Sequence, residues 1–205
     1  MEDFYHQFIE RLSDTSWWEF IAVIAGIASV WFSRKENILV YPVGLVNTII
    51  YIYLSFENHL LGEASVQVYY TVMSIYGWIL WAKRDTQDRP VLHISFSTLG
   101  QWIQHIIFFV IIYLILFFSL SYLKEAFWPN AIPWADAFAA ATAYTGMWLM
   151  AKKKVESWYW WIATNIASIP LFYVKGLAFT SFYYFVLLIM AFWGLPEWKR
   201  KAKKV

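Results

Sequence analysis

The sequence has no cysteine among its 205 residues, so disulfide bonds and thiolate chemistry are excluded. Charged side chains are scarce as well: they make up 15% of the chain, whereas a soluble domain has about a quarter. In their place stand 60% hydrophobic and 22% aromatic residues, with a mean hydropathy of +0.48. This composition predicts an all-α integral membrane protein, and we expect residues 1–205 to form a single transmembrane domain.

Catalytic signatures are missing too. The sequence contains no HExxH motif, P-loop, nucleophile elbow or glycine fingerprint. Four histidines lack the spacing of metal ligands, and their role stays open: His6, His59, His93 and His105. Carboxylates near the apolar runs fall at predicted helix ends or in connections: Glu19, Glu57, Glu63, Glu125 and Asp136. We therefore expect no catalytic residue, no metal and no cofactor.

Two kinds of membrane protein can also be set aside. A proton-coupled pump usually carries a carboxylate at mid-depth in the membrane, and none is clearly placed there. A retinal-binding protein with seven helices needs a lysine in its last helix, whereas residues 178–195 contain none.

Seven apolar runs are long enough, or nearly so, to cross a membrane as helices. They lie at about 17–33, 36–55, 62–82, 97–122, 133–151, 157–175 and 178–195. The first 16 residues are polar and acidic, so we expect no cleavable signal peptide. The predicted organisation is a first three-helix bundle at 17–82, a linker helix at 97–122, a second three-helix bundle at 133–195 and a basic cytoplasmic tail at 196–205.

Lysine and arginine gather on one side of these predicted helices. Thirteen of the 16 lie there, namely Arg34, Lys35, Lys83, Arg84, Arg89, Lys152, Lys153, Lys154, Lys199, Arg200, Lys201, Lys203 and Lys204. The other side holds Arg11, Lys124 and Lys175. The positive-inside rule then predicts an external N-terminus and a cytoplasmic C-terminus, in agreement with an odd number of helices.

The two predicted bundles resemble each other in sequence. Asn165 in the sixth run follows Asn47 in the second by 118 residues, and Trp198 with its basic neighbours follows Trp81 by 117. Because a single linker helix separates the bundles, the repeats are parallel and related by an axis along the membrane normal. In transporters of this design the substrate lies between the repeats near mid-depth.

The sixth run places polar and aromatic side chains on one helical face. Trp158, Trp161, Asn165, Ser168 and Phe172 are spaced three or four residues apart. Asn165 lies about 13 Å from the start of the run, near the middle of a ~30 Å hydrocarbon layer. An amide at that depth needs a partner, which is either a ligand or a neighbouring helix.

Four further side chains reach a similar depth: Asn47, Gln67, Tyr70 and Tyr184. Amides offer paired donors and acceptors that suit hydroxyls or a carboxamide. Tryptophan and tyrosine faces suit a flat ring, above all a delocalised cation. No buried lysine or carboxylate is available for a phosphate or a compact charge. The chemistry favours an uncharged or softly cationic ring compound that bears a sugar, and it disfavours nucleotides.

The run Trp158–Asn165 has the pattern WxxWxxxN and is followed by Gly176, Ser181 and Tyr184. In the first half, Gly44-Leu-Val-Asn47, Gln67 and the run Ile75–Trp81 complete the pattern. With these residues the chain resembles the PnuC family of bacterial vitamin transporters from about Trp17 to Trp198. The resemblance implies a fold similar to that of the SWEET sugar transporters, with three, one and three helices.

The resemblance also implies an activity, namely transport of nicotinamide riboside, an NAD precursor, across the bacterial inner membrane by facilitated diffusion with alternating access. A cytoplasmic nicotinamide riboside kinase would trap the product. The implied substrate contacts are Asn47, Gln67, Trp158, Trp161 and Asn165, extended by Tyr70, Phe172 and Tyr184. The alternatives are transport of thiamine or another B vitamin, an intramembrane enzyme, and a sensor or scaffold that does not transport. Membrane lipid is an expected partner, nucleic acid is not, and homo-oligomer formation stays open.

Overall fold

The computed structural model of the chain describes residues 16–57, 61–127 and 131–204, with side chains for 16–54, 66–124 and 131–204. Seven α-helices occupy these ranges: α2 Trp17–Lys35, α3 Val40–Glu57, α4 Leu61–Ala82, α5 Leu99–Phe127, α6 Pro133–Ala151, α7 Ser157–Val174 and α8 Ala178–Ala202. The all-α prediction with seven helices is confirmed. Expectations for His6, Arg11 and His59, and for the side chains of Glu57, Glu63 and Glu125, lie outside the described residues.

Three helices depart by four residues or more from their predicted bounds, and one of them is α5, which continues to Phe127. α3 begins at Val40 because Glu36 adopts a left-handed conformation (φ 60°) that ends α2 four residues earlier. α8 continues through Pro196 to Ala202, so most of the predicted basic tail is helical. Trp198 stabilises the additional turns of α8, because its side chain is fully buried and its Nε1 donates to the Ser33 carbonyl at 3.0 Å.

Local sequence signals explain several helix ends. The Ser16 side chain accepts a hydrogen bond from the Glu19 backbone N–H at 3.2 Å and caps the start of α2. α6 begins at Pro133, where a missing N–H costs nothing, and Asp136 accepts from the Ile132 N–H at 2.7 Å. Beyond α7, Gly176 supplies the left-handed turn (φ 76°) that leads into α8.

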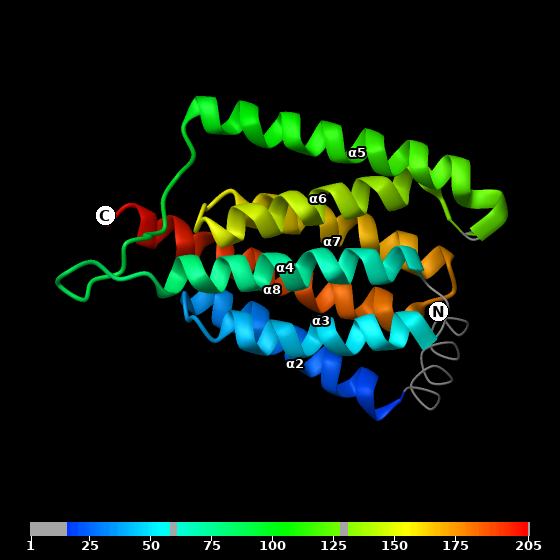
Figure 1. Cartoon of the computed structure of the whole chain (residues 1–205), viewed down its shortest axis with the longest axis horizontal. Helices are drawn as coiled ribbons and strands as arrows, with labels where there is room; N and C mark the ends of the chain where they lie inside the picture. Colours follow the sequence, from blue (N-terminus) through cyan, green and yellow to red (C-terminus); the bar gives the residue numbers. More distant parts are fainter. Residues whose placement is uncertain (1–15, 58–60, 128–130, 205) are drawn as a thin grey trace.

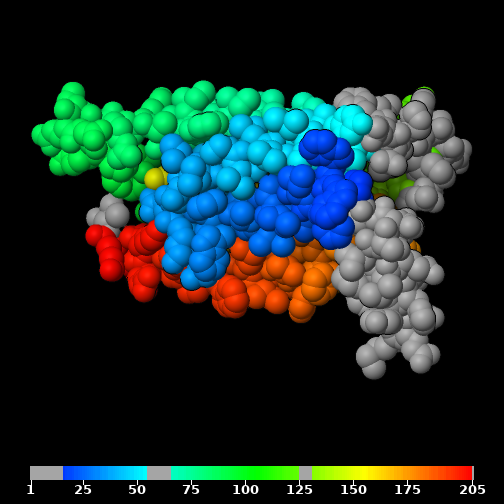
Figure 2. Space-filling view, turned by 90° about the horizontal axis from the view of Figure 1, so that it is seen from below, coloured from blue at the N-terminus to red at the C-terminus, as the bar shows by residue number. Residues whose placement is uncertain are grey.

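The helices form two groups of three with α5 at the edge (Figure 1). α2, α3 and α4 pack on one another and make up the first bundle, and α6, α7 and α8 make up the second. The bundles meet where α2 contacts α8 and where α4 contacts α6, while α5 lies along α6. Seen from below, the blue α2 of the first bundle lies directly against the orange to red α8 (Figure 2).

The bundles repeat the same packing detail. A Cβ built on Gly77 of α4 would lie 2.4 Å from the Tyr41 hydroxyl, and one built on Gly194 of α8 would lie 2.3 Å from the Trp158 indole. Each glycine therefore lets the first large ring of the second helix in its bundle lie flat against the third. Gly194 follows Gly77, and Trp158 follows Tyr41, by 117 residues in both cases. The same spacing of 117 separates Ser33 from Met150, which bond to each other, so parallel repeats meet along a common axis.

A large core lies at the end of the molecule where the C-terminus is found (Figure 1). We name it the basic end: it comprises the last turn of α2, the connections 83–98 and 152–156, and the last turns of α8. The buried core there consists of Val40, Tyr41, Trp81, Ile94, Met150, Val155, Trp158, Ala191 and Trp198. Both bundles contribute to this core, so it joins them at one end.

Hydropathy alone singles out few of these helices. Among the described residues, Leu99–Lys124 has a mean hydropathy of 2.7 and Ala178–Ala202 one of 1.7, and both are long enough to cross a membrane. The Leu99–Lys124 segment is also the one least covered by other helices. The remaining helices carry more tyrosine, tryptophan and amide side chains, which a hydropathy scale rates as polar although they pack well in a bundle interior.

Candidate functional site

α7 carries the face predicted from the sequence. Asn165 and Ser168 are buried on it, with 3% and 2% of their surfaces exposed, and Trp161 is half-buried. The Asn165 side chain forms no hydrogen bond with any described residue. Buried polar groups nearly always have a partner, because losing water without a replacement is unfavourable. Asn165 is therefore a candidate for binding a ligand, although the described residues also include other buried polar atoms without a hydrogen-bond partner, such as Trp158 Nε1 and Trp160 Nε1.

Four rings from three helices lie together one turn before Asn165. Tyr70 of α4 lies 6.3 Å from Trp161 of α7 and 6.4 Å from Tyr144 of α6, measured between ring centroids. Tyr144 stacks on Tyr69 at 4.1 Å with only 18° between the planes. The Tyr69 hydroxyl also donates to the Tyr144 carbonyl at 3.0 Å. We call these four residues the aromatic group, and it spans the contact between the two bundles.

Gly146 of α6 determines where the Trp161 indole lies. A Cβ built on Gly146 would come within 3.2 Å of two indole atoms, closer than a side chain normally approaches. The absence of a side chain thus lets the indole rest on the α6 backbone. The orientation of Trp161 toward Tyr70 follows from this close contact.

Asn47 has different surroundings from Asn165. Its Nδ2 donates to the Ala22 carbonyl of α2 at 2.7 Å. A Cβ built on Gly26 would lie 2.9 Å from this Nδ2 and 2.2 Å from the Tyr183 hydroxyl, so α2, α3 and α8 approach closely there. This bonding favours a structural role for Asn47, in which it ties α3 to α2.

The other predicted contact residues are spread along the bundles. Gln67 is 8% exposed and lies one turn before Tyr70 on α4, so it approaches the aromatic group. Phe172 and Tyr184 stack on each other at 5.1 Å, near the end of α7 that is remote from the basic end. Trp158 is 1% exposed and belongs to the core of the basic end, where its ring meets Trp198 at 5.7 Å. The structure thus brings Tyr70 and Trp161 together, places Gln67 one turn from Tyr70 on α4, and leaves Trp158 in the core.

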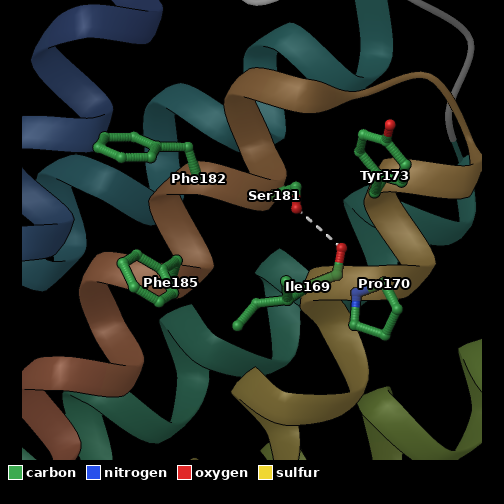
Figure 3. Close-up of a pocket in the computed structure, with 6 residues that line it drawn as sticks. All are labelled: Ile169, Pro170, Tyr173, Ser181, Phe182 and Phe185. Carbon is green, nitrogen blue, oxygen red and sulfur yellow. Dashed lines mark hydrogen bonds between the residues drawn. The ribbon is translucent and has the colours of Figure 1, made fainter. Parts of the chain in front are cut away.

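A hollow of about 370 Å³ opens between α7 and α8 (Figure 3). It is lined by Ile169, Pro170, Tyr173, Ser181, Phe182 and Phe185. Ser181 Oγ donates to the Ile169 carbonyl at 2.8 Å, and the remaining lining is apolar. None of the eight predicted contact residues lines this hollow, and its exposed rings face outward, so it does not suit a polar substrate.

Charged groups stay away from the aromatic group. In the helices that the structure describes, lysine, arginine, aspartate and glutamate lie within the first turn or the last two turns. At the basic end, partial burial lowers the pKa of Lys152, whose ammonium lies 4.3 Å from the centre of the Trp148 ring, and the charge of Lys154 lowers it further. The middle of the bundles therefore offers aromatic faces and amides, but no cation for a phosphate.

Sequence reasoning did not identify Tyr69, Tyr144 or Gly146. Tyr144 lies in an alanine-rich helix, and its spacing to Trp161 and Tyr70 carries no periodic signal because these residues come from different helices. A contact between helices far apart in sequence becomes visible only when the bundles are assembled. The four-ring arrangement is therefore a finding of the structure.

Comparison with known proteins gives the site a context. A family model described as nicotinamide mononucleotide transporter matches residues 16–200. The nicotinamide riboside transporter PnuC of Escherichia coli is 25% identical over 211 residues, which cover 93% of this chain and 88% of that protein. The riboflavin/roseoflavin transporter RibM of Streptomyces davaonensis is 23% identical and covers 92% of this chain and 87% of its own length.

Among solved structures, the crystal structure of the vitamin B3 transporter PnuC is similar to this chain. The two share a TM-score of 0.74 and 22% sequence identity, over 99% of this chain and 89% of that one. At this identity the likeness establishes the fold. It agrees with the seven-helix architecture described above.

Proposed function

The chain belongs to the nicotinamide mononucleotide transporter family, and from this premise we propose that it carries nicotinamide riboside across the bacterial inner membrane. As a family member it is a transporter and not an enzyme, and it is a multi-pass membrane protein. The observation that carries the choice of substrate is the buried amide of Asn165 beside the aromatic group. Nicotinamide riboside has a cationic pyridinium ring, a carboxamide and a ribose, which match these groups.

Each group takes a specific part in the proposed complex. Trp161 and Tyr70 stack on the pyridinium ring, for which their electron-rich faces are suited. Asn165 bonds the carboxamide or a ribose hydroxyl, and Gln67 bonds a second polar edge. Tyr144 extends the aromatic surface onto α6. The stacked pair Phe172 and Tyr184 lies further along α7, on the path away from the basic end.

The riboside is favoured over the mononucleotide by charge. A phosphate needs a cation or several N–H donors, and the described helices have lysine and arginine only in their end turns. Riboflavin, which is named for one relative, has a larger and uncharged ring system. The faces of Trp161 and Tyr70 suit the cationic pyridinium ring better than an uncharged ring.

The transport cycle follows from the two bundles. We take residues 17–82 and 133–195 as the units that rock around the site, with 97–122 as the linker between them. The excess of lysine and arginine supports a cytoplasmic basic end and an external N-terminus. A cytoplasmic kinase that phosphorylates the product would maintain the gradient, since the site itself holds no charge for ion coupling.

Binding and uptake test the proposal. Calorimetric titration of the purified protein with nicotinamide riboside, its mononucleotide, thiamine and riboflavin should give the tightest binding for the riboside, by about tenfold or more. Uptake of radiolabelled riboside into proteoliposomes should then saturate and be competed by unlabelled riboside. If another vitamin bound more tightly, the assignment of nicotinamide riboside as the substrate would be wrong. Binding of the riboside without its uptake would indicate a sensor.

A further inference from the structure

The two bundles are bonded to each other at the basic end by a pair of charges on the repeat axis. Glu36 ends α2, Lys153 follows α6, and the two positions are 117 residues apart, the spacing of the repeat. Lys153 Nζ donates to Glu36 Oε1 at 2.9 Å. Both residues adopt left-handed backbone conformations, with φ of 60° and 51°. Residues other than glycine rarely take this conformation, so the surroundings must favour it at both positions.

This pair is well shielded from water. The Lys153 side chain is 6% exposed and its ammonium also lies 4.6 Å from the centre of the Trp81 ring of α4. The Glu36 side chain is 26% exposed and receives a second ammonium, from Lys201 of α8, at 3.4 Å. Removing one member of a buried pair leaves the other charge without compensation, which is strongly unfavourable. The bond therefore favours the arrangement in which the two bundles touch.

Further bonds between the bundles surround the pair. Arg34 Nε of α2 donates to Glu197 Oε2 of α8 at 2.6 Å. Trp81 of the first bundle donates to the Ala151 carbonyl of the second at 3.2 Å, and Trp198 of the second donates to the Ser33 carbonyl of the first at 3.0 Å. The two tryptophans are again 117 residues apart, and each donates its indole N–H to a carbonyl of the other repeat, although the two carbonyls are 118 residues apart.

Among the residues that the structure describes, the opposite end is bonded differently. There Lys175 after α7 forms an ion pair with Asp136 of α6, and both residues belong to the second bundle. This pair stabilises one bundle internally and can persist when the bundles separate. The basic end differs because its ion pairs and indole bonds cross from one bundle to the other.

We propose that Glu36 and Lys153 form the lock that closes the basic end of the transport path, and that separation of this pair opens it. The inference rests on the proposed transport function for its meaning. Its test uses no substrate, so its failure is distinct from a failure of the substrate assignment. Lys201, Arg34 and Glu197 add to the lock, and Trp81 and Trp198 each donate a hydrogen bond to the opposite repeat.

The chain lacks cysteine, so one introduced thiol reports the opening of the lock without background. Ser33 is 3% exposed beneath the pair and is replaced by cysteine in the otherwise unchanged protein. We expect slow reaction of Ser33→Cys with a polar maleimide. Adding Glu36→Gln, which keeps the shape and removes the charge, should speed labelling about tenfold or more. Equal labelling rates with and without Glu36→Gln would overturn the proposal.

Two controls separate opening from general unfolding. Ala137 is fully buried near the other end of α6, so a thiol introduced by Ala137→Cys should still react slowly with the maleimide when Glu36→Gln is present. Faster labelling of both thiols, at positions 33 and 137, would also overturn the lock. Asp85→Asn removes an exposed ion pair with Arg89 at the same end and should leave Ser33→Cys labelling unchanged. If the Glu36→Gln protein does not fold, Lys153→Met is tested instead, again combined with Ser33→Cys and with Ala137→Cys. In this variant the Glu36 carboxylate still has Lys201 as an ion-pair partner.

Discussion

Asn47 on α3 and Asn165 on α7 carry the same amide in related helices, but the two side chains have different partners. Asn47 bonds the Ala22 carbonyl of α2 within its own bundle. Asn165 is more deeply buried and bonds no described residue. One amide is used to hold two helices together, and the other remains available for a ligand.

The difference comes from a single residue of register. Equivalent positions of the two repeats are 117 residues apart. This spacing is seen in the packing of Tyr41 on Gly77 and of Trp158 on Gly194, in the Ser33–Met150 bond and in the Glu36–Lys153 pair. The two asparagines, however, are 118 residues apart. One residue turns a side chain by about 100° around a helix. The position equivalent to Asn47 is therefore Thr164, and Thr164 indeed bonds Thr142 of α6, the first helix of its own bundle, at 3.0 Å.

The largest effect is expected for Asn165→Ala. If this amide binds the substrate, its loss should weaken binding of nicotinamide riboside by about tenfold to a hundredfold, because a polar group of the ligand is left buried without a partner. The melting temperature should change little. Calorimetric titration and thermal unfolding measure the two quantities, and unchanged affinity would remove Asn165 from the site.

The repeat register is tested by Gly77→Ala and Gly194→Ala. In each variant the added methyl group would collide with a buried ring of the neighbouring helix, Tyr41 or Trp158. We expect each to lower the free energy of unfolding by about 1–3 kcal/mol. Gly100, where a Cβ would meet nothing within 4 Å, is the matched control, and Gly100→Ala should be neutral or slightly stabilising. A harmless change at one of the two glycines would break the equivalence of the repeats.

The smallest effects are expected for Asn47 and Thr164, whose side chains each bond a neighbouring helix of their own bundle. Asn47→Ala and Thr164→Val each remove one hydrogen bond between neighbouring helices and should lower stability by about 1 kcal/mol. Substrate affinity should stay within about twofold of the parent protein. A loss of affinity in Asn47→Ala as large as that in Asn165→Ala would show that both amides contact the substrate and would refute the comparison.

Helix number and the grouping into three, one and three could be predicted from the sequence, because long apolar runs and clusters of lysine and arginine are local signals. The 118-residue match of the asparagines was a misleading signal: identical residue types suggested equivalence, but the packing of rings on Gly77 and Gly194 sets a different register. A pattern along one helix cannot reveal which neighbouring helix each side chain meets.

The site was predictable in part for the same reason. The face of α7 with Trp161 and Asn165 follows from helical periodicity, and so does the approach of Gln67 and Tyr70 on α4. Tyr144 and Gly146 could not be found, since their importance arises from contacts with Tyr69 and Trp161 across helices. Trp158 belongs to the WxxWxxxN pattern and its ring packs in the core, where its Nε1 is buried without a hydrogen-bond partner among the described residues.

The two halves of the molecule are related by the repeat, but they differ at the asparagine that we propose as a substrate contact. This difference bears on the orientation of a bound substrate. Were both amides free, a substrate could lie in the middle in two poses related by the repeat axis, with its sugar pointing either way. With Asn165 as the proposed contact and no asparagine at the equivalent position of the other repeat, a bound nucleoside would have one preferred orientation relative to the two membrane faces. It would then enter and leave with the same end leading, without turning over on the way.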